Sequence, residues 1–115
     1  MMVVLNVSRG TVLASTVKVA DSFWRRLVGL LGTDGLEPGT GLIIKPCNSI
    51  HTIGMRYNID VVFVNRNGRI SKISHSLPSG RISCCLSSSY VIELPAGTAK
   101  STGTETGDKL DLNVM

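Results

Sequence analysis

The chain has 115 residues, of which 43% are hydrophobic and 17% charged, a composition that excludes a disordered segment and predicts a single folded domain over residues 1–115. The formal net charge of +4 arises from Lys and Arg residues spread between Arg9 and Lys109. Only one Trp, two Tyr and two Phe accompany them, so the basic stripe and the stacking platform of a nucleic-acid-binding protein are both missing.

The chain begins with two predicted strands, over residues 3–7 and 12–19. Both are rich in β-branched residues, and the turn residues Ser8, Arg9 and Gly10 separate them. This pattern is typical of a β-hairpin.

A helix is predicted next, over about residues 21–31. Asp21 or Ser22 can cap its first amides, and Gly32 can end it. The apolar residues recur with helical spacing and form one stripe: Phe23, Trp24, Leu27, Leu30 and Leu31. Arg26 lies at the edge of this stripe, from which it can reach over the surface on which the helix packs.

The second part of the chain is dominated by strand signals. Asn67-Gly68 is a strong hairpin signal between two of the predicted strands. The runs predicted to be strands are residues 41–45, 59–64, 69–75, 90–94 and 109–114. Six to eight short strands with one helix indicate an α+β fold, mainly antiparallel β, in the form of a small sandwich or partly closed barrel with one amphipathic helix packed against it. Parallel βαβ architecture is disfavoured, because too few helices are available as crossovers.

Reactive side chains concentrate in residues 46–64. If residues 47–55 are extended, Cys47, His51 and Met55 share one face, and these are ligand types that Cu(I) selects. Residues four positions apart on a strand are about 13 Å apart, however, which is too far to share an ion. A zinc site lacks its second ligand pair. We therefore expect neither a metal nor another cofactor.

Cys47 and His51 also suggest a nucleophile and its base, the minimum for cysteine catalysis. The alternative is that Cys47 is a small buried hydrophobic residue and that His51 donates to a backbone carbonyl. We favour this alternative, because the only predicted helix, whose N-terminus would lower the pKa of a thiol, lies elsewhere in the sequence.

Two carboxylates fall inside apolar strands, Asp60 and Glu93. A buried carboxylate needs a cationic or hydrogen-bonding partner. The candidates are Arg26, Arg56 and His51. We expect Arg26 to bridge the helix to one of the two carboxylates, in preference to a general acid–base pair.

Five motifs in a fixed order resemble a known family. They are Phe23-Trp24-x-Arg26-Leu27-x-Gly29-Leu30, Gly41-Leu42 with Pro46-Cys47-Asn48-Ser49-Ile50-His51-Thr52-x-Gly54-Met55, Ile59-Asp60-Val61-Val62-Phe63, Val91-x-Glu93-Leu94-x-Ala96-Gly97 and Gly107-Asp108. In these motifs the chain is similar to the domain-of-unknown-function family 192 of bacteria and archaea. The resemblance implies a small β-rich, barrel-like fold. It brings no established activity, substrate or cofactor.

We therefore expect a small non-catalytic binding module for a small polar ligand or a protein partner. The predicted ligand-binding residues are His51, Thr52, Met55, Arg56, Asp60, Arg26 and Glu93, with the mouth of the barrel as the site. The alternative is a hydrolase or transferase-like enzyme that uses Cys47 and His51, or Asp60 as a general base. The oligomeric state stays open.

The expected location is the cytoplasm, without membrane association. The first residues read as a strand rather than a signal peptide, and no apolar run approaches the roughly 20 residues that span a bilayer. Cys47, Cys84 and Cys85 make an odd count, which fits reduced thiols rather than a disulfide framework.

Overall fold

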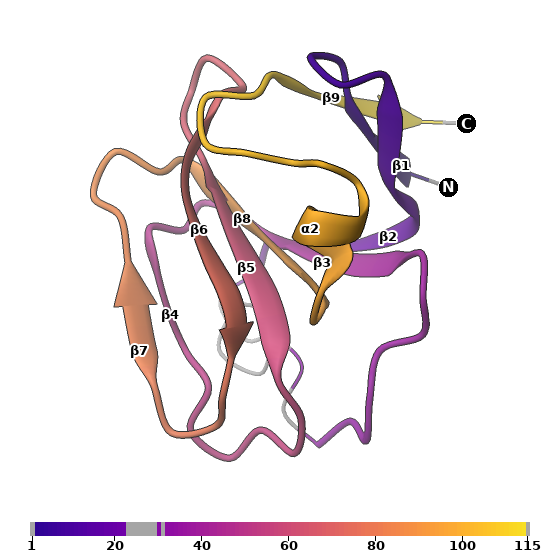
Figure 1. Ribbon diagram of the computed structural model, residues 1–115. Helices are drawn as coiled ribbons and strands as arrows, with labels where there is room; N and C mark the ends of the chain where they lie inside the picture. Colours follow the sequence, from indigo (N-terminus) through magenta and orange to yellow (C-terminus); the bar gives the residue numbers. More distant parts are fainter. Residues whose placement is uncertain (1, 23–29, 31, 115) are drawn as a thin grey trace.

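A computed structural model describes residues 2–22, 30 and 32–114 of the chain (Figure 1). The strands in these residues are β1 (Met2–Asn6), β2 (Thr11–Ala20), β3 (Thr40–Ile44), β4 (Ser49–His51), β5 (Ile59–Val64), β6 (Ile70–Leu77), β7 (Ile82–Cys84), β8 (Tyr90–Pro95) and β9 (Leu110–Val114), and the helix is α2 (Thr98–Ser101). All seven predicted strands are confirmed to within three residues. The short strand β7 and the helix α2 were not predicted. The helix predicted over 21–31 falls, for residues 23–29 and 31, outside the described residues.

Seven strands form one mixed sheet in the order β6-β5-β8-β3-β2-β1-β9, and β4 pairs with β7 in a second sheet of two strands. The pairs are antiparallel except β2 with β3, which is parallel. The predicted fold class, α+β with mainly antiparallel β structure, is confirmed. The parallel pair corrects the expectation of antiparallel pairing: residues 21–39 connect β2 to β3 and are long enough for a crossover connection.

The large sheet curls until its two edge strands meet at one end. An antiparallel bridge joins Arg69 to Lys109, and the Leu110 amide donates to the Gly68 carbonyl at 2.8 Å. Gly68 has a φ of 79°, and an added Cβ would lie 3.3 Å from the Leu110 carbonyl oxygen, so the closure requires glycine at this turn. The partly closed barrel is therefore confirmed, and the predicted Asn67-Gly68 turn forms part of its closure.

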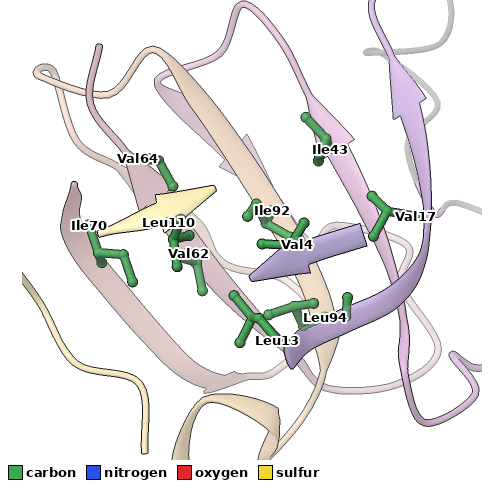
Figure 2. Close-up of a cluster of buried hydrophobic side chains, with 11 residues drawn as sticks. Val4, Leu13, Val17, Ile43, Val62, Val64, Ile70, Ile92, Leu94 and Leu110 are labelled. Carbon is green, nitrogen blue, oxygen red and sulfur yellow. The ribbon is translucent and has the colours of Figure 1, made fainter. Parts of the chain in front are cut away.

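Two hydrophobic clusters lie on opposite faces of the sheet. On β5, Val62 and Val64 belong to the inner cluster, shown in Figure 2, whereas Val61 and Phe63 belong to the outer one. Ile50 of β4 is part of the outer cluster, so the two-stranded β4–β7 sheet covers that face. Because both faces of β5 are covered, all six of its residues are buried, as its continuous apolar run indicates.

Candidate functional site

The segment from residue 46 to residue 64 is two strands joined by a bend, and it does not place its reactive side chains on one face. Strand β4 covers only Ser49–His51. His51 is exposed, whereas Met55 is buried at 8% relative exposure. The prediction that Cys47, His51 and Met55 share a face is therefore wrong, because the chain leaves the extended conformation after His51 and turns at Gly54, where φ is 86°.

The nucleophile and base suggested by the sequence are not joined by a described hydrogen bond. The Cys47 thiol donates to the Ser49 carbonyl at 3.1 Å. Cys84 is exposed, and Cys47 and Cys85 are half-buried. Within the described ranges, no group of three or more His, Cys, Asp or Glu side chains is arranged to hold a metal ion.

Thr52 is fully buried and joins the bend to the loop before β7. Its hydroxyl donates to the Pro78 carbonyl at 2.6 Å and accepts from the Arg81 amide at 2.9 Å. Its own amide donates to the Arg81 carbonyl at 2.8 Å, and its carbonyl accepts from Met55 and Gly80. The polar groups of Thr52 are therefore used inside the protein, where they hold two loops together.

Replacing Thr52 with valine is expected to lower the free energy of unfolding by about 2 kcal/mol, because the Arg81 amide and the Pro78 carbonyl lose a buried partner. Thr52→Ser retains the hydroxyl and is the control, with an expected loss of about 1 kcal/mol from the missing methyl group. Urea denaturation of both variants measures the difference. An unfolding free energy of Thr52→Val equal to that of the wild type would show that the hydroxyl contributes nothing.

Asp60 is fully buried and is held by backbone amides. Its Oδ1 accepts from the Ser76 amide at 2.8 Å and the Gly97 amide at 3.2 Å, and its Oδ2 accepts from the Ala99 amide at 2.9 Å. Asp60 thereby ties β6 and α2 to β5. The expectation of a hydrogen-bonding partner is confirmed, although the donors are peptide groups of segments that the sequence places far from Asp60.

Two of the three cations proposed as partners of Asp60 lie elsewhere. Arg56 is exposed and forms an ion pair with Asp34. His51 is exposed on β4. Arg26 lies outside the described residues, so its predicted bridge to Asp60 or Glu93 stays a prediction.

Glu93 is the most perturbed carboxyl group in the described part of the chain. It has 4% relative exposure, and its neighbours across the ladders are Leu42 on β3 and Val61 on β5. No hydrogen bond or ion pair joins its side chain to any described residue. Burial raises the pKa of Glu93 from 4.5 to about 7.

A third carboxyl group, Asp108, was missed by the sequence analysis because it follows a turn glycine rather than lying in an apolar run. Its Oδ2 accepts from Arg9 Nε at 2.9 Å, from Asn6 Nδ2 at 3.0 Å and from the Glu105 amide at 2.9 Å. The hydrogen bond from Arg9 is the main cause that lowers the pKa of Asp108 to about 2. This cluster joins β1 to the turn before β9 and is structural.

A pocket of about 390 Å³ opens at the opposite end of β8 from Asp60, and it is lined by Asp21, Lys45, Pro46, Ser89 and Tyr90. Three strands create it. Ala20 pairs with Ile44, and Ile44 pairs with Val91. If each ladder is continued by one residue, Asp21 lies beside Lys45 and Lys45 lies beside Tyr90. Neighbouring strands are about 4.8 Å apart.

The walls of this pocket are fixed by backbone hydrogen bonds and by core packing. The Lys45 amide donates to the Ala20 carbonyl at 3.1 Å, and the Cys47 amide donates to the Ser89 carbonyl at 3.1 Å. The peptide bond between Lys45 and Pro46 is cis. The side chain of Tyr90 packs against the inner hydrophobic cluster, so the pocket lies at the mouth of the barrel.

The lining of the pocket carries both signs of charge, on Asp21 and Lys45. Lys45 and Asp21 are exposed, while Ser89 and Tyr90 are half-buried. Burial, with the nearby negative charge of Asp111, raises the pKa of Tyr90 to about 12, so its phenol keeps its proton at neutral pH. Of the residues predicted for the mouth, none of those that the structure describes lines this pocket. The sequence contains no motif that joins Asp21, Lys45 and Tyr90, because only strand register brings them together.

None of the helices in the described part of the chain is both long and apolar enough to cross a membrane.

Comparison with known proteins gives a family without an assigned activity. The family DUF192, described as "Uncharacterized ACR", matches residues 4–112. A UPF0127 protein of Pyrococcus furiosus is 31% identical over 117 residues, which cover 96% of this chain and 98% of that protein. A UPF0127 protein of Thermococcus sibiricus is 28% identical over 114 residues, which cover 96% of this chain and 74% of that protein.

Two crystal structures share the fold. A protein of unknown function from Novosphingobium aromaticivorans superposes with a TM-score of 0.83 at 20% identity, over 96% of this chain and 82% of that one. A Sinorhizobium meliloti protein, described as a proposed transcription regulator, superposes with a TM-score of 0.82 at 23% identity, over 96% of this chain and 90% of that one. At these identities the likeness concerns the fold alone.

Proposed function

The chain belongs to the DUF192 family of uncharacterized proteins, and from its geometry we propose that it is a non-catalytic module that binds a small organic anion in the pocket at the mouth of the barrel. The observation that carries this proposal is the pocket itself. Its volume of about 390 Å³ falls within the range of small-molecule sites, which are concave and carry a few placed polar groups.

Lys45 supplies the charge that selects an anion. No ion pair joins its ammonium group to a carboxylate among the described residues, so a ligand anion would not have to displace a protein partner. Tyr90, which keeps its proton at neutral pH, and the hydroxyl of Ser89 can donate further hydrogen bonds to the same ligand. Donors of this kind are strongest toward a charged acceptor.

Asp21 bears on the expected charge of the ligand. This residue lines the pocket with Lys45, and its negative charge would disfavour a second negative charge on the ligand. A small monocarboxylate therefore fits the site better than a dicarboxylate or a phosphate.

The chemistry of the pocket supports binding rather than catalysis. Among the described residues, its lining includes neither a thiol nor an imidazole. The perturbed carboxyl, Glu93, is buried between Leu42 and Val61 rather than hydrogen-bonded to His51. Asp60, the candidate general base, accepts hydrogen bonds from three backbone amides, and no described hydrogen bond joins Cys47 to His51, so neither arrangement considered for the enzyme is supported by these contacts.

Lys45→Met is expected to weaken binding of a small monocarboxylate at least tenfold, because it removes a charged hydrogen bond worth about 1.5–3 kcal/mol. The measurement is an NMR titration of the ¹⁵N-labelled chain with acetate, lactate, glycine, succinate, inorganic phosphate and glucose. We expect shifts at Lys45, Ser89 and Tyr90 that are largest with the monocarboxylates.

Lys100→Met is the matched control, because Lys100 is an exposed lysine on α2 at the other end of the barrel. It should leave the titration unchanged. Shifts that appear elsewhere, or equal binding by Lys45→Met and the wild type, would refute the proposal.

A further inference from the structure

The outward face of the β4–β7 sheet carries large side chains that nothing in the described structure covers. His51 lies opposite Ile82, and Ser49 lies opposite Cys84. All four residues are exposed, whereas Ile50 and Ser83, which point the other way, are buried. Ile82, the first residue of β7, is 73% exposed.

Two more exposed aliphatic residues adjoin this sheet. Ile53 follows β4 by two residues and is 58% exposed, and Leu86 follows β7 by two residues and is 86% exposed. We call Ser49, His51, Ile53, Ile82, Cys84 and Leu86 the ribbon face. Single exposed aliphatic residues are ordinary. Here, however, three exposed aliphatic residues lie on the two-stranded β4–β7 sheet or within two residues of it. Grouped apolar residues that are rimmed by polar ones mark interaction surfaces.

Basic residues predominate in the part of the sequence that contains β4 and β7. Between residues 46 and 92 the chain contains five Lys and Arg residues, namely Arg56, Arg66, Arg69, Lys72 and Arg81, and a single acidic residue, Asp60. Asp60 is fully buried and accepts hydrogen bonds from three backbone amides, so its charge is not presented to a docking protein.

Two of these cations lie next to the ribbon face itself. Lys72 Nζ donates to the Cys84 carbonyl at 3.0 Å and lies 5.6 Å from the centre of the Phe63 ring. Arg81 directly precedes Ile82 and is exposed. The apolar residues are therefore bordered by positive charge on the strand that carries Ile82 and Cys84.

We propose that the ribbon face is a docking surface for an acidic segment of a partner protein that also carries large apolar side chains. The apolar side chains would cover Ile53, Ile82 and Leu86, and the carboxylates would face Lys72 and Arg81, which is the complementary arrangement of charge. A nucleic acid would also meet the positive charge. The face, however, offers aliphatic residues where nucleic-acid sites use aromatic rings for stacking.

The proposal uses none of the residues that line the mouth pocket, so it can fail or hold independently of the proposed function. The test is a selection of phage-displayed 12-residue peptides on the immobilised full chain. We expect peptides that combine several Asp or Glu residues with at least two large apolar residues. Their affinity should fall as NaCl is raised from 50 to 300 mM, because the charges that steer and hold them are exposed.

Ile82→Asp and Arg81→Glu are each expected to weaken a selected peptide at least tenfold. Ile82 is largely exposed, so its replacement should leave the melting temperature nearly unchanged. Val7→Asp is the matched control, because Val7 is also aliphatic and 58% exposed, but it follows β1. It should bind the peptide like the wild type.

Four outcomes would overturn the proposal. They are selection of no peptide, selection of peptides without acidic residues, equal loss of binding in Val7→Asp and Ile82→Asp, and binding of a single-stranded oligonucleotide that Ile82→Asp abolishes. The last would assign the surface to nucleic acid instead.

Discussion

Replacing Asp60 with alanine is expected to lower the free energy of unfolding by about 4 kcal/mol, the largest effect of any single substitution proposed for this chain. Three backbone amides, of Ser76, Gly97 and Ala99, would lose their acceptor in a fully buried site. Each buried unpaired donor carries a desolvation penalty of about 1–3 kcal/mol, although water entering the vacated space would satisfy part of it.

Urea denaturation measures the loss of stability, and amide hydrogen exchange locates it. In Asp60→Asn, which keeps one acceptor oxygen and folds more readily, exchange of the Ser76, Gly97 and Ala99 amides should accelerate more than that of β1 and β2. Asp34→Ala is the control, because Asp34 is a largely exposed acid in a surface ion pair and should change stability by less than about 1 kcal/mol. A uniform increase in exchange across the sheet would show that Asp60 does not anchor α2 and β6 locally.

Replacing Glu93 with glutamine is expected to stabilise the protein at pH 8 by about 3 kcal/mol and to change little at pH 4. The sign follows from burial, which raises the pKa of Glu93 from 4.5 to about 7. When the pH lies between these two pKa values, Glu93 is protonated in the folded protein and deprotonated in the unfolded chain. Stability conferred by the protonated carboxyl is therefore present below pH 4.5 and is lost as the pH rises through 7.

The measurement is the difference in unfolding free energy between wild type and Glu93→Gln, taken at several pH values from 4 to 8. The difference should grow from pH 4.5 to pH 7 and then level off. Glu37→Gln is the control, because Glu37 is exposed and its replacement should alter stability by less than about 0.5 kcal/mol at every pH. A difference for Glu93→Gln that is independent of pH would show that the carboxyl is not desolvated in the folded state.

Asp60 and Glu93 show why two similar sequence patterns have different structural outcomes. Both interrupt apolar strands, and both were assigned the same set of candidate partners. In the sheet they point to opposite faces: Asp60 lies beside Val62 on the side that α2 covers, where peptide amides are available, and Glu93 lies between Leu42 and Val61. Alternation along a strand indicates that a residue is buried, but it does not reveal which distant segment lies against it.

The ligand-binding residues were predicted from chemical type and nearness in sequence, and the structure distributes them widely. Thr52 joins two loops, Met55 is in the outer hydrophobic cluster, and His51 is exposed on the ribbon face. The pocket is instead lined by residues that end three strands, and Tyr90 had been interpreted only as the first residue of a strand. No local signal predicts that Asp21 and Tyr90 are two strands apart.

What the sequence by itself determined is the local structure and the class of fold. The apolar runs of β3, β5 and β8 indicate buried strands, and Asn67-Gly68 indicates the β5–β6 hairpin. Together they predict an α+β fold, either a small sandwich or a partly closed barrel. These signals depend on backbone propensity and hydrophobic periodicity, which act over a few residues. Tertiary structure alone decided the parallel β2–β3 pair, the barrel closure at Arg69 and Lys109, the amide partners of Asp60 and the mouth pocket. Each of these is a contact between residues distant in the chain, and its geometry depends on how all the strands pack together.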